Sequence, residues 1–317
     1  MNLTLNKPQR IFFAALAALA AVLLAAAAFC DLPLDQALYA PGNPFGIVLE
    51  AFCYWPLYLP VALLGAVWTF LYRQNASRHV LGEVLVIAVF FGLLSQSLPN
   101  LSARGLLTLS DSMVAFLSLA LALALTVLLI SIVSRWSRAT LIRADFLFKF
   151  GVALCLADNV VINALKLLWR RPRFDDLTAA GNLVSFRPWY LPLGPGGTSF
   201  PSGHTAAACG VLTLLLLPLL FERCRGRELA ITGGCYGFIA LAAFSRLIMG
   251  RHYLSDTVAA AVLMTLLFFA LTKTRRFAGA LARTRSAAAA AETEAQSKSA
   301  PAAEDAAADG GAPRQDS

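Results

Sequence analysis

The sequence predicts an all-α fold, a polytopic membrane helix bundle with about eight transmembrane helices. Hydrophobic residues make up 58% of the 317 residues and charged residues only 14%. The mean hydropathy of +0.68 is far above that of a soluble domain. A hydrocarbon layer of about 30 Å requires about 20 apolar residues per helix. Stretches of about this length occur at 11–30, 47–72, 81–98, 112–134, 146–168, 203–221, 229–248 and 253–272.

The first apolar stretch is predicted to be a retained anchor helix. Lys7 and Arg10 precede it, as in a signal sequence, but it ends in AAAAFC without a small-x-small cleavage site. The six cysteines fall mostly inside apolar stretches and show no CxxC spacing. They predict neither a disulfide framework nor a metal site.

The basic residues predict the orientation of the helices. Short loops rich in Lys and Arg stay in the cytoplasm. With the N-terminus inside and the helices alternating, every inside segment is basic, and both chain ends lie inside. The net charge of +8 follows this pattern and gathers on no single face, so we expect no nucleic-acid partner. The low-complexity segment 286–317 is predicted to be a disordered cytoplasmic tail.

Two outside segments break the charge rule. The stretch WRRPRF contains Arg170, Arg171 and Arg173, and the turn GRHYL places Arg251 near Arg246. Positive charge placed against the topological preference is most simply explained by a bound anion. The alternative is that these long side chains reach for the membrane interface.

Two of the three histidines stand at outside helix ends. His79 lies in an inside loop, whereas His204 and His252 each begin an apolar stretch. In PSGH, Ser202 is a good helix N-cap and Gly203 lets a ligand approach the free backbone amides, which favour anions. His204 can then exchange a proton with the bound group.

The second histidine is predicted to be a nucleophile or base. His252 and Asp256 are four residues apart at the start of the last helix, so they share a face. We expect the carboxylate to accept the Nδ1 proton, which leaves the Nε2 lone pair free. Arg246 stands one short turn away and can reach the same anion.

A third stretch adds further donors at the end of a helix. Asn159, Asn163, Lys166 and Arg170 follow helical spacing and form a polar stripe on an apolar helix. Polar residues inside a membrane are functional candidates. Asp175 and Asp176 follow this stretch and are adjacent loop residues. They form no converging set, so neither a metal nor another cofactor is predicted.

These stretches together resemble the signature of the type 2 phosphatidic acid phosphatase superfamily, K-x6-R-P, P-S-G-H and S-R-x5-H-x3-D. Lys166 and Arg173 have the first spacing, with Phe174 in place of the proline. The other two motifs match completely. The resemblance implies a six-helix phosphatase core over 81–275. Two N-terminal transmembrane helices (1–80) and the tail (286–317) lie outside it.

The resemblance also implies roles for the residues. His252 would attack phosphorus and form a phosphohistidine, His204 would protonate the leaving oxygen and then activate water, and Asp256 would orient His252. The phosphate oxygens would be held by Lys166, Arg173, Ser202, Gly203 and Arg246.

The function expected from these observations is metal-independent removal of phosphate from a lipid phosphate or diphosphate. The site would face the periplasm from the bacterial inner membrane. Candidate substrates are phosphatidic acid, phosphatidylglycerol phosphate, undecaprenyl pyrophosphate and the phosphates of lipid A. Alternatives are a lipid phosphotransferase with the same site, an anion transporter and, last, an inactive scaffold.

Overall fold

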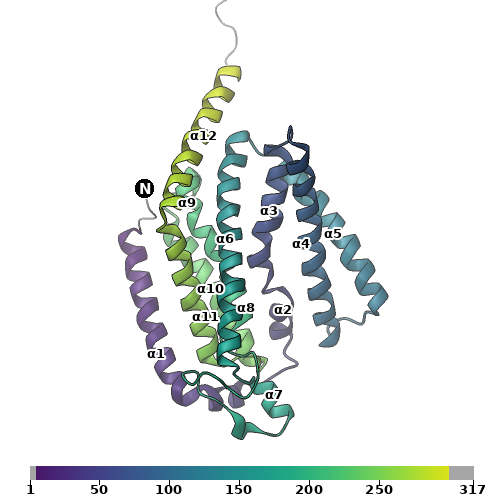
Figure 1. Cartoon of the computed structure of the whole chain (residues 1–317), viewed down its shortest axis with the longest axis vertical. Coiled ribbons are helices and arrows are strands. Elements are labelled where there is room, and N and C mark those ends of the chain that lie inside the picture. Colours follow the sequence, from purple (N-terminus) through teal and green to yellow (C-terminus); the bar gives the residue numbers. More distant parts are fainter. Residues whose placement is uncertain (1–4, 300–317) are drawn as a thin grey trace, which may run out of the picture.

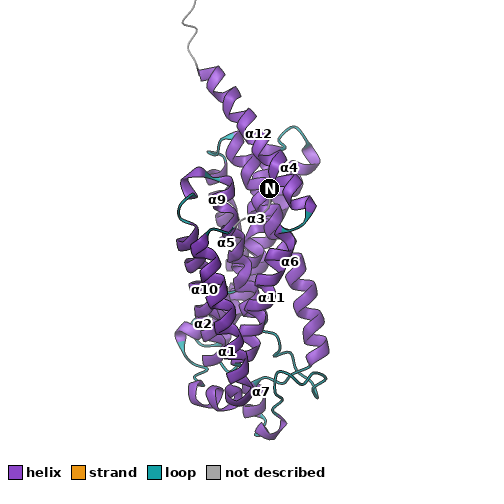
Figure 2. Cartoon of the chain, turned by 90° about the vertical axis from the view of Figure 1, so that its left-hand side faces the viewer, coloured by secondary structure: helices purple, strands orange, loops and turns teal. Residues whose placement is uncertain are grey.

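The computed structural model describes residues 5–299, and this part of the chain consists of helices and loops without strands (Figure 2). Eight helical segments in it are long and apolar enough to cross a membrane, which confirms the predicted fold class. These segments are α1 (Lys7–Leu38), α2 and α3 (Pro44–Phe52 and Trp55–Leu71), α4 (Ala76–Ala103), α5 (Asp111–Val133), α6 with α7 (Arg138–Trp169 and Phe174–Ala179), α8 to α9 (Gly203–Ala208, then η2 Cys209–Leu216, then Leu217–Leu220), α10 (Glu228–Ile248) and α11 (Leu254–Thr272).

Polar side chains cap the start of six of the described helices, four of them long. A side-chain oxygen at the N-cap accepts a hydrogen bond from a backbone N–H of the first turn, which would otherwise be unpaired. At α1 the pairing is reciprocal, because Gln9 also bonds the backbone of Asn6. The N-caps that act in this way are Asn6, Asn43, Asn75, Ser110, Ser137 and Ser202.

Two of the predicted spans differ in detail. The stretch 47–72 is not one helix, because the chain breaks between α2 and α3 around Cys53 and Tyr54. Pro56 lies in the first turn of α3, where its missing N–H leaves no bond unmade. The stretch 11–30 is longer than predicted, because α1 begins at Lys7 and continues to Leu38.

The predicted disordered tail is wrong over residues 286–299. These residues continue α12 (Arg275–Ser299), and residues 300–317 lie outside the described part of the chain. Alanine, glutamate and lysine favour helix even where little surface is buried. Arg143 of α6 also pairs with Glu292 at 2.7 Å, which ties α12 to the bundle.

The bundle has two distinct ends. In Figure 1 the start of α1 and the helix α12 lie at one end, and α7 with its loop lies at the other. The first two membrane passes, predicted to lie outside the family core, pack against the rest of the bundle. Helix α1 packs against α10 and α11, and α3 packs against α4 and α6. Helix α5, expected within the core, packs mainly against α4 at the edge of the bundle.

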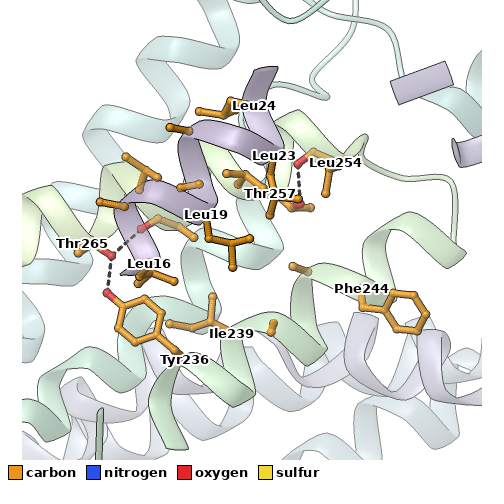
Figure 3. Close-up of a pocket in the computed structure, with 18 of the residues that line it drawn as sticks. Leu16, Leu19, Leu23, Leu24, Tyr236, Ile239, Phe244, Leu254, Thr257 and Thr265 are labelled. Atoms are coloured by element: carbon orange, nitrogen blue, oxygen red, sulfur yellow. Dashed lines mark hydrogen bonds between the residues drawn. The ribbon is translucent and has the colours of Figure 1, made fainter. Parts of the chain in front are cut away.

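Helix α1 and the pair α10 and α11 enclose an apolar groove of about 550 Å³ (Figure 3). Its walls include Leu16, Leu23, Ile239 and Phe244, and it contains none of the predicted site residues.

Candidate functional site

The start of α8 is tied to the start of α11. As predicted, Ser202 caps α8, with its Oγ accepting the Thr205 N–H at 3.3 Å. The backbone N–H of Ser202 donates to the carbonyl oxygen of Asp256 at 3.0 Å. This bond brings the PSGH segment and the His252 segment together, although about 50 residues separate them in sequence.

His252 is held by a backbone carbonyl and not directly by Asp256, which corrects the predicted contact. Its Nδ1 lies 2.6 Å from the carbonyl oxygen of Ser199 and 3.8 Å from the nearer Asp256 oxygen. A carbonyl oxygen only accepts, so Nδ1 carries the proton and Nε2 keeps its lone pair. The Nε2 lone pair is therefore free as predicted, but the acceptor of the Nδ1 proton is the Ser199 carbonyl oxygen and not Asp256.

Asp256 acts on His252 through Ser199. One of its carboxylate oxygens accepts the Ser199 hydroxyl at 2.5 Å and the Tyr253 backbone N–H at 3.0 Å. The other accepts Arg171 Nη1 at 2.6 Å. The buried carboxylate therefore fixes the residue whose carbonyl orients the imidazole.

The two site histidines lie beside each other. The ring centroids of His204 and His252 are 6.3 Å apart. Tyr54, from the break between α2 and α3, packs its ring edge against His204 with a centroid separation of 4.9 Å. Tyr54 was not predicted, because its only signal was an aromatic residue in an aromatic-rich apolar stretch.

Burial keeps His252 neutral. It is 1% exposed, and this loss of solvent lowers the pKa of the His252 imidazole to about 4, although the neighbouring Asp256 acts in the opposite direction. The charges of Lys166 and Arg173 lower this pKa further. At neutral pH the imidazole is therefore in the form that can attack phosphorus.

Arg246 and Arg173 retain unpaired nitrogens. Fully buried Arg246 donates from Nη2 to the Gly46 carbonyl oxygen at 2.9 Å and from Nε to Ser245. Arg173 donates from Nη2 to Thr198 Oγ1 at 2.9 Å. Among the described residues, Arg246 Nη1 and Arg173 Nε have no hydrogen-bond partner, although Arg246 Nη1 faces the Glu50 carboxylate at 3.8 Å. Buried donors of this kind are suited to the oxygens of a bound anion.

Lys166 lies directly against Gly203. A Cβ built on Gly203 would be 2.8 Å from Lys166 Nζ and 3.2 Å from the Tyr54 hydroxyl. Lys166 also lines a pocket of about 380 Å³ with Asn163, Arg170 and the loop at 196–198. A larger residue at position 203 would therefore displace the ammonium group from the first turn of α8.

Arg171 and Arg251, which we expected to bind an anion, form ion pairs with carboxylates instead. Buried Arg171 donates to Asp256 and, from Nη2 at 2.9 Å, to Asp31 of α1. Arg251 pairs with Asp175 at 2.6 Å and approaches Glu50 of α2 at 3.6 Å. Asp31 and Glu50 were missed because nothing in their local sequence distinguishes them from other loop and helix-end carboxylates.

The described residues contain no group of three or more His, Cys, Asp or Glu side chains that could hold a metal ion. All six cysteines are free thiols.

The fold and the site define a class of protein. The buried imidazole of His252 and the half-buried imidazole of His204 lie side by side at one end of a bundle of membrane-crossing helices, with Lys166, Arg173 and Arg246 supplying positive charge. Such a site can hold a phosphate group and transfer it to an imidazole.

The comparison with protein families agrees with this class. The family model described as PAP2 superfamily matches residues 146–279, a range that contains Lys166, His204, His252 and Asp256. This match confirms the predicted resemblance over these residues, and the members of that superfamily are generally phosphatases. Helices α1 to α5 lie before the match. No curated protein and no solved structure matches the chain.

Proposed function

We propose that the protein is a phosphatase that removes phosphate from a lipid phosphate or diphosphate through a phosphohistidine on His252. The observation that carries the proposal is the pairing of His252 Nδ1–H with the Ser199 carbonyl oxygen at 2.6 Å. This hydrogen bond leaves Nε2 free to act as the nucleophile. The same site contains His204 and the positively charged side chains of Lys166, Arg173 and Arg246.

In the first step the Nε2 lone pair of His252 forms a bond to phosphorus, and the bond between phosphorus and the leaving oxygen breaks. The leaving oxygen takes that electron pair and a proton from His204. Lys166, Arg173 and Arg246 bind the other phosphate oxygens, where negative charge gathers. The lipid alcohol departs, or a lipid monophosphate when the substrate is a diphosphate.

In the second step neutral His204 takes a proton from water as the water oxygen bonds to phosphorus. The bond between phosphorus and Nε2 breaks, and its electron pair returns to His252. Inorganic phosphate leaves, and both histidines regain their starting protonation. Ser202 and the Gly203 amide contribute further donors at the start of α8.

A lipid substrate is supported by the surroundings of the pocket that Lys166 lines. Leu167, in the same pocket, is 78% exposed, and Val160, further along α6, is 70% exposed. The cationic site thus borders an apolar helix surface. A phosphate group and a hydrocarbon chain attached to it can occupy the two together.

The direct test is phosphate release by the purified protein in detergent. Phosphatidic acid, phosphatidylglycerol phosphate, undecaprenyl pyrophosphate and lipid A are supplied one at a time, with glycerol phosphate as a tail-free control. We expect inorganic phosphate from at least one lipid and far less from glycerol phosphate. Transfer that requires a second lipid as acceptor would indicate a phosphotransferase, and equal release from glycerol phosphate would contradict lipid specificity.

The proposed location is the bacterial inner membrane, with the site facing the periplasm. Val184, in the loop after α7, is 97% exposed, and Arg225 lies in the loop before α10. We expect an impermeant thiol reagent to label Val184→Cys in intact spheroplasts of a cysteine-free variant and to leave Arg225→Cys unlabelled. The opposite pattern would reverse the orientation.

A further inference from the structure

Helix α1 packs Phe12, Phe13 and Leu16 against the core and also makes polar contacts near both of its ends. Of its 32 residues only Gln9, Ala27, Asp31 and Asp35 are buried. At one end, Gln9 Nε2 donates to Thr232 Oγ1 of α10 at 3.2 Å. At the other end, Asp31 reaches the site. Between the two lies the apolar groove of Figure 3.

Asp31 makes a dense set of bonds for a residue on a membrane helix. It is 1% exposed. Its carboxylate accepts Arg171 Nη2 at 2.9 Å, the backbone N–H of Ser255 at 3.0 Å and the Ser255 hydroxyl. A buried carboxylate is stable only when its oxygens are paired in this way.

The bonds continue from Asp31 to the nucleophile. Arg171 donates to Asp256 at 2.6 Å, Asp256 accepts the Ser199 hydroxyl at 2.5 Å, and the Ser199 carbonyl accepts the His252 Nδ1 proton at 2.6 Å. Arg171 also lies over the ring of Tyr253, with its guanidinium carbon 4.0 Å from the centroid. Each of these groups has little freedom to move without the next.

We propose that Asp31 is a positioning residue for the reaction at His252, acting through Arg171 and Asp256. The inference rests on the proposed function and extends the site to a helix outside the matched family segment. Two carboxylates share one guanidinium, so the buried triad of Asp31, Arg171 and Asp256 carries a net charge of −1. That charge lies near the imidazole, which becomes positive as it bonds to phosphorus.

The decisive variant is Asp31→Asn, which keeps the size of the side chain and removes its charge. An amide nitrogen facing Arg171 would repel it, and the guanidinium would shift toward Asp256. We expect kcat to fall by about tenfold or more, the range seen when groups that orient a reactive histidine are removed. KM should stay within about twofold, because Lys166, Arg173 and Arg246 do not contact Asp31.

Gln9→Ala is the matched control. It removes the polar contact at the other end of the same helix, about 33 Å away along α1. Loosened docking of α1 would lower the thermal midpoint in both variants. Only Asp31→Asn should lower kcat in the folded protein, with p-nitrophenyl phosphate and the lipid substrate alike.

A second variant keeps the test decisive if Asp31→Asn does not fold. Ser255→Ala removes the hydroxyl that donates to Asp31 and accepts from Arg171 at 2.8 Å, and it leaves all charges in place. We expect a smaller fall in kcat at unchanged KM. The positioning role would be overturned if the folded Asp31→Asn or Ser255→Ala variant kept the wild-type kcat, or if kcat fell equally in Gln9→Ala. Either result would leave the proposed function standing. Absence of phosphate release by the wild-type protein would overturn the proposed function and this role with it.

Discussion

The rings of His204 and His252 lie 6.3 Å apart at their centroids, and of these two described residues His252 alone has a ring nitrogen hydrogen-bonded to a backbone carbonyl. This asymmetry separates their roles. The tied imidazole has a fixed lone pair for attack, whereas His204 is free to give and take a proton.

The first prediction distinguishes the two histidines by the leaving group. His204→Ala should retain appreciable activity on p-nitrophenyl phosphate, whose leaving group needs no proton, and lose nearly all activity on a lipid monophosphate. His252→Ala should be inactive on both. Steady-state rates on the two substrates and acid-labile ³²P labelling provide the measurement. Equal losses in both variants on both substrates, or label in His252→Ala, would contradict the assignment.

The second prediction concerns pH. Because the pKa of His252 is lowered to about 4, protonation removes its lone pair only in strongly acidic solution. The groups acting on it are Asp256, which raises its pKa, and Lys166 and Arg173, whose positive charges lower it, and the ring of His204 also faces it. The acid limb of kcat/KM should therefore lie near pH 4. A limb near 6.5, the ordinary pKa of histidine, would show that His252 is not buried during catalysis.

The third prediction separates neighbouring arginines. Arg171→Met leaves Asp31 and Asp256 buried without their cation, so it should destabilise the protein by about 3–5 kcal/mol. Arg173→Gln should keep the thermal midpoint and raise KM, because Arg173 has an unpaired nitrogen and is bonded only to Thr198. Thermal unfolding and kinetics of both variants in detergent decide the matter. A stability loss confined to Arg173→Gln would reverse these roles.

The fourth prediction tests the contact at the start of α8. In Gly203→Ala the new methyl group would meet Lys166 Nζ at 2.8 Å and push the ammonium away, so kcat/KM should fall sharply. Gly237→Ala in α10 has open space around the new methyl and is the control. The measurement is kcat/KM of both variants. Equal values would mean that catalysis does not require Lys166 Nζ to lie against residue 203.

The fifth prediction concerns metal ions and vanadate. The site meets phosphate charge with Lys166, Arg173 and Arg246, so hydrolysis should persist in excess EDTA. Vanadate, which adopts the five-coordinate geometry of the transferring phosphorus, should inhibit. Loss of activity on chelation that added Mg²⁺ restores would contradict this mechanism.

The motif residues could be predicted from sequence because their spacing reflects local geometry. Ser202 caps its helix as expected, since an N-cap is a property of a few consecutive residues. The partner of His252 Nδ1 could not be predicted in this way. The i, i+4 spacing favoured Asp256, but the Ser199 carbonyl, 53 residues earlier, takes the proton.

The same distinction applies to the charges and the tail. Arginines in the predicted outside loops indicated that negative charge lies nearby. The charge pattern of the sequence does not tell whether a bound ligand or a carboxylate of the protein supplies that charge. For Arg171 a carboxylate supplies it, because Asp31, 140 residues earlier, accepts a hydrogen bond from its guanidinium. The alanine-rich segment 286–299 was predicted to be disordered because it buries little, whereas its intrinsic preference for helix prevails in α12.

The triad of Asp31, Arg171 and Asp256 has a consequence for biosynthesis. It joins the first membrane helix to α11, the last one in the described bundle. A nascent chain that has inserted only its first helices contains Asp31 but neither of its partners. The nucleophile can therefore be oriented only after α11 has left the ribosome and docked, so partly synthesised chains carry no competent site into the membrane.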